Sequence, residues 1–442
     1  MMRKGSTSLF WWGPVGLALV AFACGHDPGQ ETTPPPLGDD GGSTADEGGA
    51  TSETGSFGDG SCSVVTTADG GSFAPASHPP APTVTSGGGP VIASPSVTPI
   101  FFSGDDPSVE SLVGNFLTAL TTSTYWGETT SQYGVGALSA RPGIQLAQTA
   151  PDSMQDSDVQ TLLLAALNGN DPKFPTSYAS AMLVVLTPSG TTVQDASGDV
   201  SCEQFGGYHS EVQLDAAHGN QTVAYVVIPR CASFGNLSGI EAITASLSHE
   251  LIESSTDPSS SAPALAAPDS AHSFWTLAMG GGELADMCSQ TNTSYVQGVT
   301  GFWVARSWSN SQAAAGHDPC VPAPSCGAYF NAAPVLPDSV QSDGVTVPDV
   351  HIPAGGMGTV QLDLFSDAPT TKAWQVAVTA MSGDPSQVGQ LSFTLDRSSG
   401  QNGDVLNLSI TVEQAAETGF EVFYVFSTMG ERQSVWVGLV GN

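Results

Sequence analysis

A histidine and two glutamates near the middle of the chain have the spacing of a metal-binding helix. They are His249, Glu250 and Glu253, within the run Ser-His-Glu-Leu-Ile-Glu. Because residues four apart lie one turn from each other on one helical face, His249 and Glu253 can reach a single ion. Zinc accepts imidazole nitrogen and carboxylate oxygen, and the adjacent Glu250 can take a proton from a metal-bound water. The pattern matches the zinc motif H-E-x-x-H except that Glu253 replaces the second histidine.

The helix that must carry this motif has recognisable ends. The run Ser-Gly-Ile-Glu from Ser238 to Glu241 has the pattern of a capping box, which predicts a helix that starts just after Ser238. It is expected to end at Asp257, because the proline that follows disfavours a helical residue before it. The apolar stripe expected to face the core consists of Ile240, Ile243, Leu247 and Leu251. His249 and Glu253 lie nearly opposite that stripe, among small residues.

The motif alone also allows a structural interpretation. A capped helix with a partly buried histidine that hydrogen-bonds to a neighbouring carboxylate would carry the same residues. In the same way, Glu283 and Asp286 would fit a surface turn. His209 stands in a glycine-rich loop, where it would fit a packed or solvent-facing position.

Length and charge narrow the class of protein. A chain of 442 residues is long enough for two or three domains. It carries 9 Lys and Arg against 42 Asp and Glu, a formal net charge of -33. Such a charge repels nucleic acid and anionic membrane surfaces, so we expect no nucleic-acid partner. It also suits solubility outside the cell.

The start of the chain is expected to direct export. Basic residues precede an apolar run that ends at Ala23, which is typical of a signal peptide. Cys24 follows directly, as in a bacterial lipoprotein signal. We therefore predict a lipoprotein-type signal peptide over 1–23 and a lipid on Cys24 that holds the chain at the outer membrane or cell surface; ordinary secretion is the alternative. Residues 24–82 are rich in Gly, Ser, Thr, Asp and Pro, which predicts a disordered tether.

Seven cysteines are present, and six remain if Cys24 carries lipid. An even number in an exported chain favours disulfides, but six cysteines allow fifteen pairings and the sequence does not choose among them. The pairing taken here as the expectation is Cys202–Cys231, Cys288–Cys320 and Cys62–Cys326. No C-x-x-C pair occurs, which argues against a thiolate zinc site.

Helices alternate with strands over the first two thirds of the chain. An amphipathic helix is expected to open at Pro107, and a second helix is predicted over Ser157–Asn168 with a cap at its first residue. Near-continuous apolar runs at Ala181–Leu186 and Val223–Ile228 are typical of buried strands. We therefore predict an α+β (mixed α/β) domain over 83–330.

Residues 331–442 show strand alternation and no helical period. The six expected strands are Val360–Phe365, Trp374–Ala380, Leu391–Asp396, Val405–Val412, Phe420–Phe426 and Ser434–Val440. Turns rich in Gly, Asp and Ser separate them. This pattern predicts an all-β sandwich of immunoglobulin-like size, and no cluster of catalytic side chains stands out in it.

Several short segments between Gly88 and Cys320 follow one another in the order of a known family. They are Gly88-Gly-Pro-Val91, Leu183-Val-Val-Leu-Thr187, Cys202 followed by Gly207-Tyr208-His209, Ser248-His249-Glu250-Leu251 with Glu253, and Glu283-Leu-Ala-Asp286-Met-Cys288. In this order they resemble the EXORDIUM-like, phosphate-induced protein family, secreted plant proteins with many bacterial relatives. The last two segments together are the specific part of the resemblance, which covers roughly half of the chain.

The resemblance implies a zincin-like core in which the His-Glu-x-x-Glu helix meets the Glu-x-x-Asp segment. The expected roles are zinc ligation by His249, Glu253 and Glu283, a supporting or alternate ligand at Asp286, and a general base at Glu250. His209 is expected either to bind the metal or to polarise a substrate carbonyl. The family itself implies no established reaction.

These observations predict an exported, lipid-anchored, zinc-dependent hydrolase, most directly a metallopeptidase that acts on a peptide or a cell-wall polymer. The alternative is a non-catalytic surface protein that binds carbohydrate or protein through the zincin-like core and the β-sandwich. A glycosidase built on Glu250 and Glu283 ranks last, because it needs a sugar cleft that nothing in the sequence supplies.

Overall fold

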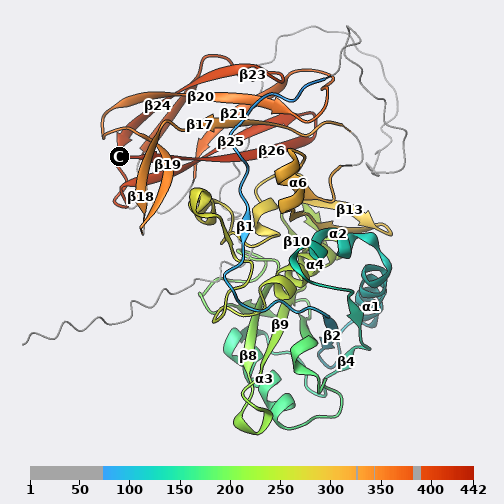
Figure 1. Ribbon diagram of the computed structural model, residues 1–442. Helices are drawn as coiled ribbons and strands as arrows, with labels where there is room; N and C mark the ends of the chain where they lie inside the picture. The colour runs from blue at the N-terminus through green and yellow to red at the C-terminus, as the bar shows by residue number, and fades with distance from the viewer. Residues whose placement is uncertain (1–72, 325–326, 343, 382–389) are drawn as a thin grey trace, which may run out of the picture.

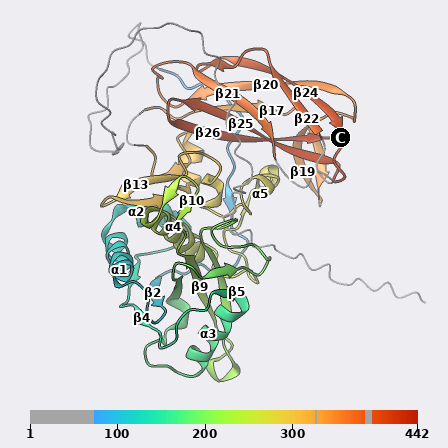
Figure 2. The same cartoon turned by 180° about the vertical axis from the view of Figure 1, so that it is seen from behind.

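The computed structural model describes residues 73–324, 327–342, 344–381 and 390–442. They form a mixed region of strands and helices, followed by a region of strands alone (Figure 1; Figure 2). The change falls at β17 (Phe330–Val335), one residue from the expected boundary. Strands outweigh helices, and the coarse expectation of a mixed α and β first part followed by an all-β second part is met.

The first region is built on a mixed sheet. Its order is β3 (Ser139–Ala140), β2 (Ser96–Phe101), β6 (Ala181–Thr187), β9 (Thr222–Pro229) and β8 (Tyr208–Gln213), with β4 (Ile144–Gln145) also paired to β2. All pairs are parallel except β8 with β9. Every residue of β6 is buried, as expected of an apolar strand covered on both faces.

Helices cover both faces of this sheet. α1 (Pro107–Thr122) and α4 (Ile240–Thr256) pack on one face, and α3 (Asp156–Asn168) packs on the other. The Asp106 carboxylate caps α1 by accepting the Ser108 N–H. The cap of α3 differs from the expectation, because the Asp158 carboxylate reaches back to the N–H of Gln155.

α4 is the central helix of the first region. Every residue from Ala242 to Thr256 is buried. Its expected capping box forms in part: the Glu241 carboxylate accepts the Ser238 N–H at 3.5 Å, but Gly239 occupies the cap position. Ile240 is 45% exposed, so the apolar stripe begins one turn later than predicted.

The small residues of α4 permit close packing rather than lining an open face. Ala242 and Ala245 pack beneath Tyr295 and Trp303, which belong to the hairpin of β13 (Tyr295–Val299) and β14 (Phe302–Ala305). Ser246 faces Gly206, two residues before β8, where a Cβ atom would lie 2.6 Å from the serine hydroxyl. The helix therefore needs small side chains because strands lie against it on several sides.

The second region contains two sheets. One has the order β17, β20 (Met357–Ser366), β24 (Val405–Gln414) and β22 (Gln390–Leu395). The other has the order β18 (Asp338–Ser342), β19 (Val345–His351), β26 (Arg432–Gly441), β25 (Phe420–Met429), β21 (Trp374–Ala380) and β23 (Ser399–Gly400). All six strands expected from the sequence are present, and β17, β18, β19 and β23 were not anticipated. Phe330, Trp374 and Phe423 fill the core with little or no exposure.

The expected tether ends earlier than residue 82. Residues 73–85, here called the clasp, run from the two-sheet region to the α/β region, as the blue segment of Figure 1 shows. The Asn402 side chain accepts the Ala76 N–H and donates to the Ala74 carbonyl. The His78 ring stacks on Phe365, with 3.7 Å between ring centroids.

The other end of the clasp joins the α/β region. β1 (Val84–Thr85) pairs with β12 (Ala267–Pro268), and His272 Nε2 lies 3.2 Å from the Pro80 carbonyl. Residues 73–82 thus belong to the fold, because these individual contacts hold a segment that has no apolar periodicity. Residues 24–72 lie outside the described part of the chain.

Two of the three expected disulfides are confirmed: Cys202–Cys231 and Cys288–Cys320. The pair Cys62–Cys326 lies outside the described residues, as do the expected signal peptide 1–23 and Cys24. In the described part of the chain, no helix has the length and apolar character needed to span a membrane.

Candidate metal centre

Three elements bring the predicted site residues together. The contributions are His249, Glu250 and Glu253 from α4, His209 from β8, and Glu283 and Asp286 from the segment before Cys288. The antiparallel edge strand β8 pairs with β9, and α4 follows β9 in the chain. Both elements therefore lie at one corner of the first region. There the segment carrying Asp286 covers the end of α4.

A first triad of ligand-type side chains consists of His249, Glu253 and Asp286. Its ligand atoms all lie within 4.8 Å of one another. His249 Nε2 is 3.0 Å from Glu253 Oε2 and 3.4 Å from Asp286 Oδ1. Ligands of a tetrahedral zinc ion with bonds of about 2.0–2.2 Å lie roughly 3.3–3.6 Å apart. The contact with Asp286 falls within this range, and the contact with Glu253 is a hydrogen-bond distance slightly below it. All three side chains are buried, with 2–3% exposed.

The backbone fixes the Glu253 carboxylate. Its Oε1 accepts the N–H groups of Ala285 at 3.1 Å and Asp286 at 3.0 Å, which leaves Oε2 beside His249. The preceding loop requires glycine, since Gly280 has φ +55° and a Cβ atom there would lie 2.8 Å from the Asp286 carboxylate. The disulfide of Cys288 to Cys320 secures the far end of the segment.

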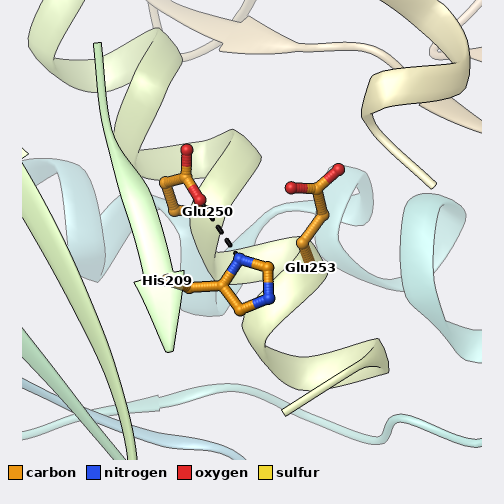
Figure 3. Close-up of side chains that lie close together, drawn as sticks. All are labelled: His209, Glu250 and Glu253. Carbon is orange, nitrogen blue, oxygen red and sulfur yellow. Dashed lines mark hydrogen bonds and ion pairs between the residues drawn. The ribbon is translucent and has the colours of Figure 1, made fainter. Parts of the chain in front are cut away.

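His209 lies between carboxylates from different elements. Its Nδ1 is 3.3 Å from Glu250 Oε2 (Figure 3), and its Nε2 is 3.2 Å from the Asp257 carbonyl oxygen. Nε2 also lies 3.7 Å from Glu283 Oε2. This approach depends on Gly207, because a Cβ atom there would lie 2.9 Å from Glu250 Cγ. The glycines before His209 thus allow the close approach of β8 to α4.

The two carboxylates of the Glu-x-x-Asp segment occupy different places. The sequence favoured Glu283 as the ligand and Asp286 as its support. In the structure Asp286 lies beside His249, whereas Glu283 lies beside His209. The reason is that the N–H groups at Ala285 and Asp286 dock on Glu253, which brings the Asp286 side chain to the first triad.

The cluster holds more negative charge than its histidines balance. Burial and the neighbouring Glu253 raise the pKa of Asp286 to about 7. Burial also raises the pKa of Glu283 well above its usual value and raises the pKa of Asp257. The ion pairs formed by arginine in the described chain lie elsewhere, at Asp105, Asp318 and Asp404. A divalent cation would balance this charge.

Burial and the neighbouring charges also shift the pKa values of Glu253 and His209. Burial alone would raise the pKa of Glu253, but His249, His209 and the Asp286 N–H together outweigh it and the net shift is downward. Burial alone would lower the pKa of His209, yet the negative charges of Glu283 and Glu250 raise it to about 10. The His209 imidazole therefore compensates neighbouring carboxylates when no metal ion is bound.

Asp257 is a site residue that the sequence identified only as the helix end. Its carbonyl oxygen accepts from His209, and its carboxylate accepts the Ala264 N–H at 2.7 Å. The first contact orients the imidazole, and the second folds the chain after α4 back over the site. A carbonyl contact depends on backbone position, so no residue type signals it in the sequence.

Comparison with known proteins assigns no family. No protein-family model matches the chain, and no curated protein matches it. Among solved structures, domains 4 and 5 of the S-layer protein SbsC are 12% identical over 26% of this chain and 53% of that one, with a TM-score of 0.18. A Bacteroides ovatus GH5 xyloglucanase is 12% identical over 21% of this chain and 17% of that one, with a TM-score of 0.14. A chimeric titin Z1Z2 is 14% identical over 26% of this chain and 95% of that one, with a TM-score of 0.14.

The chain spans about half the length of that S-layer fragment. Likenesses of this size carry no argument about fold or activity. The interpretation of the site therefore depends on its own geometry.

Proposed function

We propose that this protein is a zinc-dependent hydrolase whose metal is held by His249, Glu253 and Asp286. The observation that carries the proposal is the convergence of these three buried side chains at the spacing of a zinc shell. When bound, zinc would supply a Lewis acid and lower the pKa of a water molecule at an open position.

The other residues of the chain provide the proton chemistry. Glu250 follows His249 on α4, and its carboxylate is the group proposed to accept the proton of the attacking water. His209 Nδ1, at 3.3 Å, holds that carboxylate in place from β8. Because only 2% of the Glu250 side chain is exposed, bulk water is largely excluded from this carboxylate.

We propose a peptide as the substrate class, with a cell-wall polymer as the other choice. The support is the His-Glu pair on a helix, the residue pattern of zinc peptidases. A helix that follows a mixed sheet with an antiparallel edge strand is consistent with a zincin-like core and with the EXORDIUM-like resemblance. In the same way, two sheets in the second region are consistent with an immunoglobulin-like sandwich.

Export and lipid attachment belong to the same proposal. They are supported by the apolar N-terminal run before Cys24 and the net charge of -33. Disulfides persist in oxidising compartments, and the two disulfides in the described chain fit an extracellular location.

A non-catalytic surface protein is the second candidate. It is favoured by Glu253, which replaces a histidine ligand and already accepts two backbone N–H groups. A carboxylate used in this way has fewer lone pairs left for a metal. On this alternative, the core and the two-sheet region would bind carbohydrate or protein without turnover.

Turnover of a peptide library by the zinc-loaded full chain separates these candidates. We expect hydrolysis by the wild type and a loss of roughly 100-fold or more in Glu250→Gln, since a positioned proton acceptor contributes about 10²–10⁴ in rate. The variant should retain the zinc ion of the His249, Glu253 and Asp286 triad. Glu241→Gln, in the first turn of the same helix, is the matched control and should retain both zinc and turnover. Zinc binding without turnover in the wild type would favour the binding protein.

A further inference from the structure

We propose that His209, Glu250 and Glu253 form a second divalent-cation site that shares Glu253 with the first triad. The inference rests on the proposed function, because it assigns two ions to one hydrolytic centre. The ligand class is a transition-metal dication such as zinc, since one imidazole and two carboxylates suit that class.

The geometry of the second triad supports it. The ligand atoms of His209, Glu250 and Glu253 all lie within 4.8 Å of one another, and His209 Nδ1 is 3.3 Å from Glu250 Oε2, at the lower end of the roughly 3.3–3.6 Å between ligands of a tetrahedral zinc ion. In Figure 3 the carboxylates of both glutamates extend from α4 on the side where His209 enters from β8. Two elements of the rigid core thus position the three side chains.

The hydrogen bond of the other ring nitrogen is an independent indication. A carbonyl oxygen can only accept, so the 3.2 Å contact with Asp257 places a proton on His209 Nε2. A histidine that binds a metal usually donates its other N–H to a carbonyl or carboxylate in this way. The Nδ1 atom therefore presents either a second proton or a lone pair toward Glu250, 3.3 Å away.

A cation fits this position better than a proton does. A proton on Nδ1 would balance one carboxylate, whereas Glu250, Glu253 and Glu283 all surround the ring. Glu283 is 24% exposed, so it can move toward an ion that enters from solvent. A dication would accept the lone pair of Nδ1 and the negative charge of two carboxylates together.

Glu253, the residue shared by the two triads, would connect the two ions. Glu253 belongs to both triads, so its carboxylate would bridge them. Hydrolases with two ions about 3.5–4 Å apart use the pair to hold the attacking and the leaving oxygen of a substrate. Glu250 would then act as a ligand when both ions are present. At low metal concentration it would remain the proton acceptor.

The test is the zinc stoichiometry of the full chain. Metal-free protein is titrated with zinc chloride in a calorimeter, and the bound zinc is measured by elemental mass analysis after desalting in 1 mM calcium, which displaces zinc from surface carboxylates. We expect about two zinc ions per chain in the wild type and about one in His209→Ala. His218→Ala, which removes a histidine paired with Asp215 and outside both triads, is the matched control and should keep two.

The outcomes distinguish this inference from the proposed function. One zinc ion that His209→Ala retains and His249→Ala loses would overturn the second site and leave the proposed function standing. Two ions in both the wild type and His209→Ala would also overturn the assignment. Zinc in neither form would overturn both proposals. Circular dichroism of His209→Ala checks that this variant folds. If it does not, the question is decided by the number of zinc-binding events in the wild type and in the conservative variant His209→Gln.

Discussion

The two regions of the chain bury polar groups in different ways. Around α4 the first region gathers carboxylates and imidazoles within a few ångströms of one another. The second region fills its core with apolar and aromatic side chains and spreads its buried polar groups along separate strands, as at Asn331, Asp349 and Glu421. Of the described residues, those that could jointly hold a metal ion all lie in the first region.

The clustering of buried charge in the first region is the observation on which the proposed metal site rests. Buried charges are costly unless they are paired or bind a metal, so a chain selected for stability alone would not gather them. Natural proteins depart from local folding rules mainly at functional sites. The second region is joined to the first by the Trp275–Trp436 ring contact and the bond from the Tyr424 hydroxyl to the Ala278 carbonyl.

The largest expected effect separates stability from metal binding. Phe423 is fully buried, and its ring occupies the space over Gly438, where a Cβ atom would lie 2.2 Å away. Phe423→Ala should lower the free energy of unfolding by about 3–5 kcal/mol. Zinc stoichiometry in the folded variant should not change. Urea unfolding followed by tryptophan fluorescence, with zinc analysis of the folded fraction, checks both; loss of zinc would mean that the second region takes part in the site.

Removal of the Cys288–Cys320 disulfide should lower both the free energy of unfolding and the zinc affinity. Its sequence separation of 32 predicts a loss of about 3–4 kcal/mol from chain entropy in the double serine variant. Because Asp286 is two residues away, zinc affinity should also fall by about 10–100-fold, as for lost supporting contacts. Calorimetry measures the affinity. The double serine variant of Cys202 and Cys231 should lose similar stability with less effect on zinc, and equal effects on zinc would contradict this explanation.

Gly207→Ala tests the approach of β8 to α4. The added methyl group would meet Glu250 Cγ at 2.9 Å and Ile228 Cδ1 at 2.8 Å. We expect a loss of about 1–3 kcal/mol from overpacking and a displaced Glu250 with slower turnover. Thermal denaturation and kinetics measure the two effects. Gly114→Ala on α1 has open space around it and is the control; the explanation fails if Gly207→Ala is equally harmless.

The smallest effect concerns the clasp. His78→Ala removes the stack on Phe365, which should cost about 0.5–1.5 kcal/mol beyond the lost contact area. Zinc affinity should stay the same, because the clasp contacts no ligand of either triad in the described chain. Faster proteolysis near residue 78 with unchanged calorimetry would support this, and weaker zinc binding would show that the clasp orders the site.

Local patterns allowed much of the fold to be predicted from the sequence. α1 follows from the Asp-Pro start and the spacing of Val109, Val113, Phe116 and Leu120, all of which are buried. β6 and β9 follow from their apolar runs, and the strands of the second region follow from alternation. α4 also began and ended close to its predicted limits. In each case the signal lies within the residues of the element itself.

Other features depend on distant parts of the chain and left no local signal. The choice of Asp286 over Glu283 is set by the N–H groups that dock on Glu253. Ile240 is exposed because the helix emerges from the core at its first turn. Residues 73–82 are held in place by side chains more than 190 positions away in the sequence, such as His272 and Asn402.

The most direct test of the central claim is an anomalous difference map at the zinc absorption edge, from a crystal of the full chain grown with zinc. We predict a peak about 2.0–2.2 Å from His249 Nε2 and from a carboxylate oxygen of Glu253 and of Asp286. A second peak beside His209 would support the shared centre. Peaks confined to surface carboxylates, with the His249 triad closed by its own hydrogen bonds, would contradict the proposal that this cluster is a metal site.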